Sequence, residues 1–326
     1  MGTMRALRQN TSGGPGDLRL VEVPVPVPGP GELLVRVTAA GVNFADVMQT
    51  HGTYAGGPRP PYLAGFEAAG VVVGRGAGVT GWPPGAHVIG AGRGAFAEFM
   101  TMPAAEAAAV PPGWADEQAL GLVLNWATAL AALRPLGRLA AGENVLIHAA
   151  AGGVGQAAVR MAKHYGATVI AVASAAKHPT VRALGADHVL ERDRPGLAAE
   201  VRRLTGGAGA DLVLESAGGP GFAATLAATR RVTGRVVVYG FAAGAATITS
   251  RDLVFEHPVQ VTGLHIGTLA RAAPEMFAGL MAELRALRAA GVHPPGRPVV
   301  HDLAEGPRVL AALAAGETTG KLALRP

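Results

Sequence analysis

The stretch Asn144-Val-Leu-Ile-His-Ala-Ala-Ala-Gly152-Gly153-Val154-Gly155 decides the fold of this 326-residue chain. An apolar run ends at a cluster of glycines, and apolar side chains then recur at helical spacing from Gln156 to Tyr165, before Gly166. This order predicts a strand, a tight turn and a helix that ends at a glycine cap. The N–H groups at such a helix start have no partner within the helix, and the helix dipole adds about half a positive charge there. The stretch therefore predicts a phosphate site of the dinucleotide-binding kind.

The glycine motif is incomplete, because alanine stands at the first glycine position of Ala150-x-Gly152-x-x-Gly155. Taken alone, such a motif also fits a plain turn between a strand and a helix. Six apolar strand candidates at intervals of roughly 20 to 25 residues, with helical patterns between them, favour the cofactor interpretation. They are 144–148, 168–173, 188–190, 211–215, 235–239 and 258–264. Six such units predict an α/β fold with a doubly wound parallel sheet, in which the pyrophosphate contacts are Ala150, Gly152, Gly153, Val154 and Gly155.

The end of the second predicted strand indicates which dinucleotide is bound. Proteins that bind NAD usually carry an acid there, which accepts a hydrogen bond from the ribose 2′-hydroxyl. This chain has Ser174 and Lys177 in that region and no acid. A hydroxyl and an ammonium are compatible with a 2′-phosphate, whereas a carboxylate would repel it. The sequence therefore favours NADPH over NADH, although Lys177 would also serve simply to open the next helical segment.

Composition narrows the class of protein. Hydrophobic residues make up 49% of the chain and charged residues 16%, which argues against long disordered segments. The absence of cysteine excludes disulfides, thiolate zinc sites and a cysteine nucleophile. The longest nearly apolar stretch, Ala119–Leu133, is too short to span a membrane. The net charge is 28 − 23 = +5, but the arginines are scattered, which argues against a nucleic-acid partner. With no export signal visible in its first ten residues, we expect a cytoplasmic protein.

The pattern of apolar, proline and glycine residues changes at two places along the chain. Up to about residue 115, short apolar or alternating runs between prolines and glycines predict a β-rich domain. Asp116, Glu117 and Gln118 then predict the start of a long helix. After residue 266, the predicted elements are too few for a third domain: a helix over 273–290, a strand over 298–303, a helix near 307–315 and a strand over 321–324. We therefore expect a β-rich domain over 1–124, a Rossmann domain over 125–266, and a segment over 267–326 that returns to complete the first domain.

Several short sequence segments resemble those of a known family. They are Ala40–Asp46, Gly52–Tyr54, Gly65–Gly70, Gly94–Phe99, Ala149–Gly155 and the ending Gly320–Leu324. Together they resemble the medium-chain dehydrogenase/reductase superfamily, and within it the zinc-free quinone oxidoreductase branch that includes the ζ-crystallin type. The resemblance covers nearly the whole chain in the right order. It implies a GroES-like catalytic domain beside the Rossmann domain, with the nicotinamide at the base of a cleft, and a homodimer joined through the strand 259–264.

The chain departs from the zinc alcohol dehydrogenases of the same superfamily. Those enzymes have a cysteine near the position of Gly41, a His-Glu pair in place of Phe66-Glu67, and a loop of four cysteines after the position of Phe99. A catalytic zinc needs three protein ligands, and Phe66 has no ligating atom. We therefore expect no metal site. For Glu67 we expect a hydrogen bond to backbone or to an arginine.

The resemblance also implies roles for individual residues. Asn43 and Tyr54 would lie close to the nicotinamide and the substrate, and Asp46 would brace the turn that holds Asn43. Asn43 can both donate and accept hydrogen bonds, and Tyr54 can donate one or stack on a planar ring, although a partly exposed loop tyrosine is the plainer interpretation. Further cofactor contacts implied by the resemblance or by position at the carboxyl ends of strands are Thr128, Ala217, Gly240, Phe241 and His265. A lone histidine after a strand such as His265 is also commonly structural.

Three functions fit these features. The first is an NADPH:quinone oxidoreductase, because a quinone accepts hydride without metal polarisation when hydrogen bonds stabilise the oxygen that gains charge. The second is a 2-alkenal or enoyl-thioester reductase on the same fold, which needs a pocket of different size. The third is a non-catalytic protein that holds NADPH or binds RNA, as the ζ-crystallin resemblance permits. For the first two, water or Tyr54 would supply the final proton.

Overall fold

The apolar runs between residues 144 and 263 form one six-stranded sheet in the computed structural model, which describes residues 2–192 and 195–326. The strand order is β11-β10-β9-β12-β13-β14, and every neighbouring pair is parallel. This is the doubly wound dinucleotide-binding arrangement, so the predicted fold class is confirmed. The strands are β9 Asn144–Ile147, β10 Thr168–Ala173, β11 His188–Glu191, β12 Leu212–Glu215, β13 Arg235–Val238 and β14 Gln260–Gly263.

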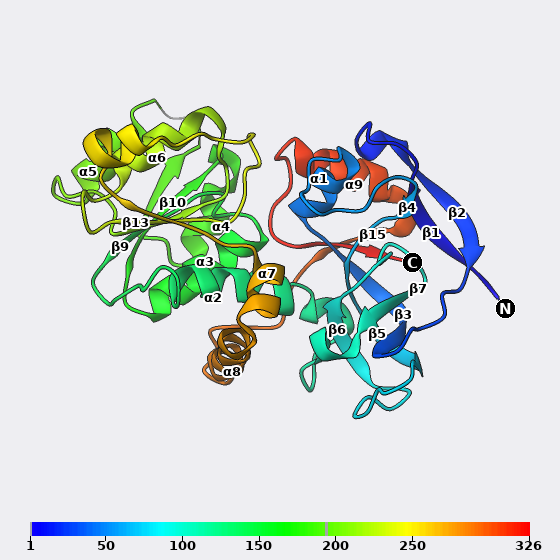
Figure 1. Ribbon diagram of the computed structural model, residues 1–326. Helices are drawn as coiled ribbons and strands as arrows, with labels where there is room; N and C mark the ends of the chain where they lie inside the picture. The colour runs from blue at the N-terminus through cyan, green and yellow to red at the C-terminus, as the bar shows by residue number, and fades with distance from the viewer. Residues whose placement is uncertain (1, 193–194) are drawn as a thin grey trace. The chain divides into compact units, whose positions relative to one another are not determined.

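Helices cover both faces of this sheet (Figure 1). Val145 and Ile147 pack into one apolar cluster while Leu146 packs into another, because successive side chains of a strand point to opposite faces. Burial on both faces explains why the inner strands of this sheet consist largely of apolar residues. The helices are α2 Ala127–Leu133, α3 Gly153–His164, α4 His178–Ala183, α5 Leu197–Leu204, α6 Phe222–Ala228, α7 Ile266–Ala272 and α8 Pro274–Ala289.

The chain divides into two compact units, which we call the first unit (Met1–Val123 and Pro295–Pro326) and the second unit (Leu124–Pro294). The boundary on the C-terminal side differs from the expected one at residue 267. Helix α8 belongs to the second unit, because Leu280, Leu284 and Leu287 are buried in the same apolar cluster as β9 and α3. The return to the first unit therefore begins at Pro295, after both α7 and α8, and not at residue 267 as the sequence indicated.

The first unit is built on strands that pair antiparallel, apart from the parallel pair of β15 with β16. Strand β3 is central in a seven-stranded sheet of order β15-β16-β3-β5-β6-β8, with β7 also paired to β3, and a second sheet has the order β2-β1-β4. The returning strand β16 pairs with β3, placing Ala323 opposite Gly41. The elements are β1 Thr3–Gln9, β2 Leu18–Pro24, β3 Glu32–Val42, α1 Phe44–Thr50, β4 Tyr62–Leu63, β5 Glu67–Arg75, β6 His87–Ala91, β7 Phe99–Pro103, β8 Ala108–Ala109, β15 Val299–Asp302, α9 Gly306–Ala314 and β16 Leu322–Arg325.

The long helix expected from Asp116 is interrupted. A 3-10 turn spans Asp116–Ala119, a π turn spans Leu122–Trp126, and regular α-helix begins only at Ala127. Between the first two pieces, Gly121 has a φ of +89°, a left-handed conformation that ends a helix. The N–H of Gly121 points to Glu67 instead, at 2.6 Å from Oε1.

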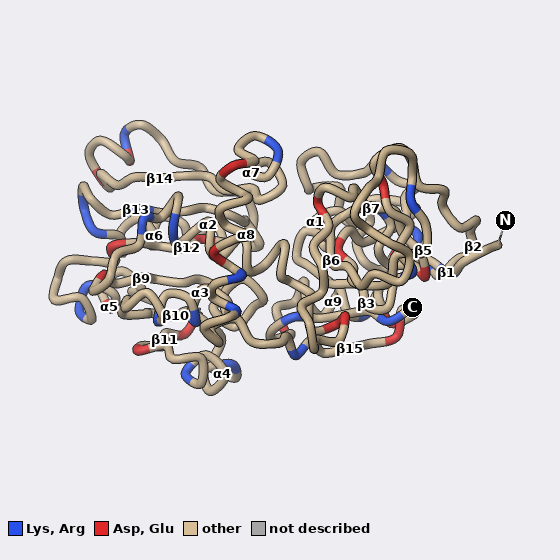
Figure 2. The backbone as a smooth tube through the Cα atoms, turned by 90° about the horizontal axis from the view of Figure 1, so that it is seen from below, with Lys and Arg blue, Asp and Glu red and all other residues tan. Residues whose placement is uncertain are grey.

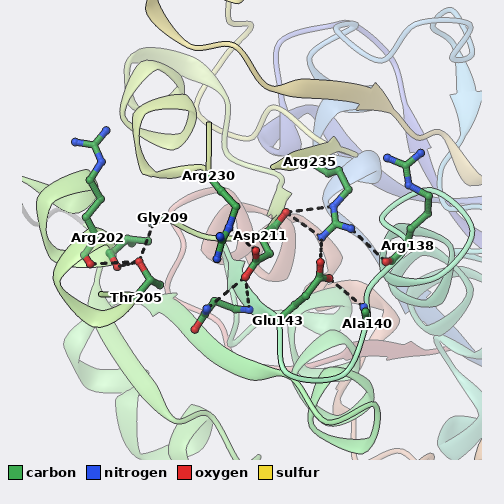
Figure 3. A network of polar contacts seen from close by, with 11 residues as sticks. Arg138, Ala140, Glu143, Arg202, Thr205, Gly209, Asp211, Arg230 and Arg235 are labelled. Carbon is green, nitrogen blue, oxygen red and sulfur yellow. Dashed lines mark hydrogen bonds and ion pairs between the residues drawn. The ribbon is translucent and has the colours of Figure 1, made fainter. Parts of the chain in front are cut away.

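Arginines tie together the amino ends of three strands in the second unit (Figure 3). Arg235 donates to Glu143 Oε1 at 2.7 Å, and Arg230 forms an ion pair with Asp211 at 2.5 Å. Asp211 also accepts the backbone N–H of Asn144 at 2.9 Å. This network fixes one edge of the sheet and leaves the opposite, carboxyl edge to the loops that bind ligands in such folds.

Charges are distributed along the chain without a dominant basic segment. Figure 2 shows lysine and arginine positions spread through each unit and interleaved with acidic positions.

Within residues 2–192 and 195–326, no helix combines the length and the apolar character that a membrane crossing requires.

Candidate functional site

The turn after β9 has the geometry that an anion site requires. Helix α3 follows it, with Gly152 as an extended N-cap residue at φ −82°. Ala149 takes the left-handed conformation at φ +48°, whereas the N–H of Ala150 donates to Val172 O at 3.0 Å as in a continuing sheet. The incomplete motif is explained by this geometry, since the left-handed residue is the one before Ala150. Gly153, Val154 and Gly155 form the first turn of α3, where backbone N–H groups point out of the helix.

Gly155 brings α3 against the strand. A Cβ atom at this position would lie 2.3 Å from Ala149 O and 2.6 Å from Ala150 Cα, both of them backbone atoms that cannot move aside. Asn125 lies beside the start of the same helix, because a Cβ on Gly153 would be 3.1 Å from Asn125 Oδ1. Thr128, one turn further along the chain in α2, is half-buried. The structure thus brings a polar side chain to the helix N-terminus that was predicted to hold a pyrophosphate.

Two cations lie at the ends of β10 and β11. Ser174 precedes a 3-10 turn over Ala175–Lys177, and its carbonyl accepts the N–H of Lys177 at 2.9 Å. Burial lowers the pKa of the Lys177 ammonium, and the positive charge of Arg192, which follows β11, lowers it further. Sequence reasoning missed Arg192. The available signal was its position directly after the third strand, whose end lies beside the end of β10 in a doubly wound sheet.

The turns after β12 and β13 are joined by backbone hydrogen bonds. Ala242 N donates to Ser216 O at 3.0 Å and Ala243 N donates to Ala217 O at 2.7 Å. The predicted contacts Ala217, Gly240 and Phe241 therefore lie on two linked turns, and Phe241 is 41% exposed.

His265 has a visible structural role. It is the N-cap residue of α7, and its Nδ1 accepts the backbone N–H of Thr268 at 3.0 Å. Burial, followed by the charge of Arg271, lowers the pKa of the His265 imidazole. A neutral ring is what this cap needs, because only an unprotonated Nδ1 can accept the hydrogen bond.

In the first unit, Asn43 is held in one orientation by a buried carboxylate and a partly buried ammonium. It follows β3 and caps α1. Its Nδ2 donates to Glu67 Oε2 at 2.9 Å, and Lys321 Nζ donates to its Oδ1 at 2.8 Å. Since one end of the amide meets a carboxylate and the other an ammonium, the amide cannot flip without losing both hydrogen bonds.

Glu67 is fully buried and pairs with Lys321 at 2.5 Å. It also accepts the N–H of Gly121, so the expected backbone contact is present and a lysine stands where an arginine was envisaged. The pair fills the space beside Gly41, where a Cβ would lie 2.3 Å from Glu67 Oε2 and 3.0 Å from Lys321 Cε. Two features of the sequence pointed to Lys321: its place in the segment Gly320–Leu324, which resembles the family's C-terminal end, and the rarity of lysine in this chain.

Asp46 braces the same turn as a neutral acid. Its Oδ2 accepts the backbone N–H of Asn43 at 2.8 Å. Burial raises the pKa of Asp46 to about 8, an effect that the Asn43 hydrogen bond and the charge of Lys321 only partly offset. Nearby, burial and then the charge of Asp46 raise the pKa of Tyr62 to about 12.

Tyr54 lies in a glycine-rich loop after α1 and is half-buried. Its carbonyl accepts the N–H of Gly57 at 3.0 Å, and Gly52 and Gly56 have φ values of +67° and +74°.

In the part of the chain that the structure describes, no three His, Asp or Glu side chains gather in a way that could hold a metal ion.

Two family models match the chain. Residues 29–112 match the alcohol dehydrogenase GroES-like domain, and residues 153–286 match the zinc-binding dehydrogenase domain.

Curated relatives include large polyketide synthases. The chain is 37% identical over 318 residues to a mycocerosic acid synthase-like polyketide synthase of Mycobacterium tuberculosis, covering 95% of this chain and 15% of the synthase. It is 46% identical over 188 residues to the erythronolide synthase EryA2 of Saccharopolyspora erythraea, covering 57% of this chain and 5% of the synthase. The chain thus spans only a small part of the length of these relatives.

Solved structures resemble the chain over its whole length. A mycobacterial protein solved in complex with NADPH is 34% identical, with a TM-score of 0.93 and coverage of 99% of this chain and 100% of that one. The Escherichia coli quinone oxidoreductase, also solved with NADPH, is 29% identical, with a TM-score of 0.91 and full coverage of both chains. The CurK enoyl reductase is 27% identical, with a TM-score of 0.89 and coverage of 99% of both chains.

The buried acid Asp46 gives a testable pH dependence. The folded carboxyl keeps its proton up to a pH of about 8, whereas the unfolded carboxyl loses it near 3.8. Its contribution to stability is therefore complete below the unfolded pKa and is lost as the pH rises toward 8. We expect Asp46→Asn, which cannot ionise, to remove this loss. Urea unfolding across this pH window should show the wild type weakening relative to the variant as the pH rises. Parallel profiles would contradict the assignment of a neutral Asp46.

Proposed function

The chain belongs to the medium-chain dehydrogenase/reductase superfamily, in its zinc-free quinone oxidoreductase-like branch, and from this premise we propose that it is an NADPH:quinone oxidoreductase. One observation carries the cofactor assignment: the glycine turn at the start of α3 and the cations Lys177 and Arg192 lie at the carboxyl edge of the same parallel sheet. The first suits a pyrophosphate and the second a 2′-phosphate. Two solved proteins of the same fold were obtained with NADPH.

When bound, NADPH supplies the hydride. The first-turn N–H groups of Gly153, Val154 and Gly155 would hold its pyrophosphate, since the N–H of Gly152 already donates to Ala149 O at 2.9 Å. Lys177 and Arg192 would hold its 2′-phosphate. Ser174 stands beside Lys177 and offers a hydroxyl to the same group. Burial raises the pKa of Asp46 to about 8, which reduces the negative charge that Asp46 places beside Asn43 at neutral pH.

Asn43 and Tyr54 are the groups we assign to the acceptor. The Asn43 amide is preorganised, since Glu67 and Lys321 fix both of its ends. Fixed dipoles stabilise developing charge better than mobile ones, because no reorganisation is needed during the reaction. We assign the final proton to the Tyr54 hydroxyl or to water.

The residues beside Gly41 do not fit a catalytic zinc. Phe66 has no ligating atom, and the Glu67 carboxylate is already neutralised by Lys321. The proposed acceptors are therefore conjugated carbonyls, in which the charge spreads onto an oxygen. A quinone is our first choice. An enoyl thioester is the second, and the similarity to polyketide synthases and to the CurK enoyl reductase supports it.

A panel of acceptors tests the reaction. We expect purified protein to consume NADPH with quinones faster than with 2-alkenals or enoyl-CoA esters, as followed by loss of NADPH absorbance under steady-state conditions. Higher kcat/KM for enoyl thioesters would establish the second choice. Binding of NADPH without turnover of any acceptor would leave the non-catalytic interpretation.

The same panel with Tyr54→Phe tests the proton donor, since an unchanged rate removes Tyr54 from that role.

Lys177 tests the choice of cofactor. Hydrogen bonds to charged groups contribute about 1.5–3 kcal/mol, so we expect Lys177→Met to raise KM for NADPH by roughly tenfold to a hundredfold and to leave KM for NADH within about twofold. Lys163→Met is the matched control, because Lys163 in the same unit pairs with Asp187 at 2.7 Å. Equal effects of Lys177→Met on both cofactors would refute the 2′-phosphate assignment.

We also propose a homodimer joined through β14. This strand ends the six-stranded sheet, and Val261 is 36% exposed on it. An uncovered edge strand offers unpaired backbone groups to a second chain. Light scattering should give the mass of two chains, and Val261→Lys should shift it toward one. A wild-type protein of single-chain mass would rule the dimer out.

A further inference from the structure

A buried carboxylate holds the turn after β12. Glu215, the last residue of that strand, is 1% exposed. Its Oε1 accepts the backbone N–H groups of Ala217 at 2.6 Å and Gly218 at 3.0 Å. Its Oε2 accepts the hydroxyl of Thr225, from α6, at 2.7 Å. All of these donors are uncharged, so the anion is stabilised by aligned dipoles at the start of the turn.

The hydrogen-bond chain continues from Thr225 to His148. The single hydroxyl proton of Thr225 is directed at Glu215, so its oxygen accepts from His148 Nε2 at 3.0 Å. His148 directly follows β9 and is buried. Burial lowers the pKa of its imidazole more than the charge of Glu215 raises it, which keeps the ring neutral with its proton on Nε2. The network therefore links the ends of β9 and β12 through α6.

The turn that Glu215 holds is interlocked with the next one. Besides the two hydrogen bonds between Ser216–Ala217 and Ala242–Ala243, Gly219 N donates to Gly244 O at 2.8 Å. Gly218 and Gly219 both have positive φ, and a Cβ on either would lie 2.4 Å from a carbonyl oxygen of the second turn. The position of the second turn therefore depends on that of the first.

We propose that Glu215, with Thr225 and His148 behind it, is a positioning residue for the cofactor: it fixes the two linked turns that carry Ala217, Gly240 and Phe241. The network lies between β9 and β12, where the strand order of the sheet reverses and where open α/β sheets bind their ligands. Hydrogen bonds to a buried carboxylate are directional, so they hold a turn in one conformation where apolar packing would allow several. This inference rests on the proposed use of NADPH.

Thr225→Val tests the proposal, because valine keeps the shape of the side chain and removes the hydroxyl that joins His148 to Glu215. The matched control is Thr229→Val in the same segment. Thr229 is 3% exposed and its hydroxyl donates to Thr225 O at 2.8 Å, without contacting Glu215. Both variants should lower Tm by similar amounts. Only Thr225→Val should weaken NADPH binding, by about tenfold in Kd measured by titration, as expected when a charged group loses a hydrogen bond. Thr225→Ser, which restores the hydroxyl, should bring Kd back to within about twofold of the wild type.

The outcomes separate a failure of the proposed function from a failure of the positioning role. Wild-type protein that does not bind NADPH would overturn the proposed function. Wild-type binding together with equal Kd values for Thr225→Val and Thr229→Val would overturn the positioning role alone. If Thr225→Val fails to fold, Glu215→Gln carries the test, since its amide oxygen can still accept the two backbone N–H groups while its NH₂ group can no longer accept from Thr225. We expect Glu215→Gln to raise Kd for NADPH by at least about fivefold, and an unchanged Kd would contradict the proposal.

Discussion

The close approach of α3 to the end of β9 is the constraint on which the second unit depends. Only a residue without Cβ fits at Gly155, because the carbonyl oxygen of Ala149 would lie 2.3 Å from that atom. This contact sets where the helix begins and therefore where its N–H groups point. The sheet holds the start of α3 in place, since the strand before the turn is buried on both faces. The phosphate site is thus a consequence of how tightly a helix packs on a strand.

A common device holds the turns around the proposed sites. In three places a buried carboxyl group at or near a strand end accepts backbone N–H groups: Asp46 accepts from Asn43, Glu67 from Gly121, and Glu215 from Ala217 and Gly218. The negative charge of each carboxyl group is suppressed or stabilised in a different way. Burial keeps Asp46 protonated, Lys321 neutralises Glu67, and neutral donors surround Glu215. Each turn is therefore fixed by directional hydrogen bonds in a place where packing alone would leave several conformations.

Local patterns predicted much of the fold and of the cofactor site. Apolar runs identified all six strands of the parallel sheet, and the runs are densest in the inner strands β9, β10, β12 and β13, because burial on both faces demands apolar side chains there. The glycine turn and Lys177 were visible because they follow strands in sequence. The pair Glu67–Lys321 was not, since it joins residues 254 positions apart, and nothing local indicates which lysine reaches which acid. The helix expected from Asp116 was interrupted by Gly121, whose left-handed conformation is fixed by a distant carboxylate. Arg192 and Glu215 likewise acquire their roles only when neighbouring strand ends come together.

The central claim is that the carboxyl edge of this sheet binds a phosphorylated dinucleotide through Gly152–Gly155 and the cations beyond β10 and β11. Thermal unfolding with increasing NADPH or NADH tests it most directly, because a ligand that binds only the folded state stabilises it by about 2.7 kcal/mol at a hundred times its Kd. The account predicts a Tm that rises with either dinucleotide and does so at lower concentrations of NADPH. A Tm that neither dinucleotide changes would contradict it.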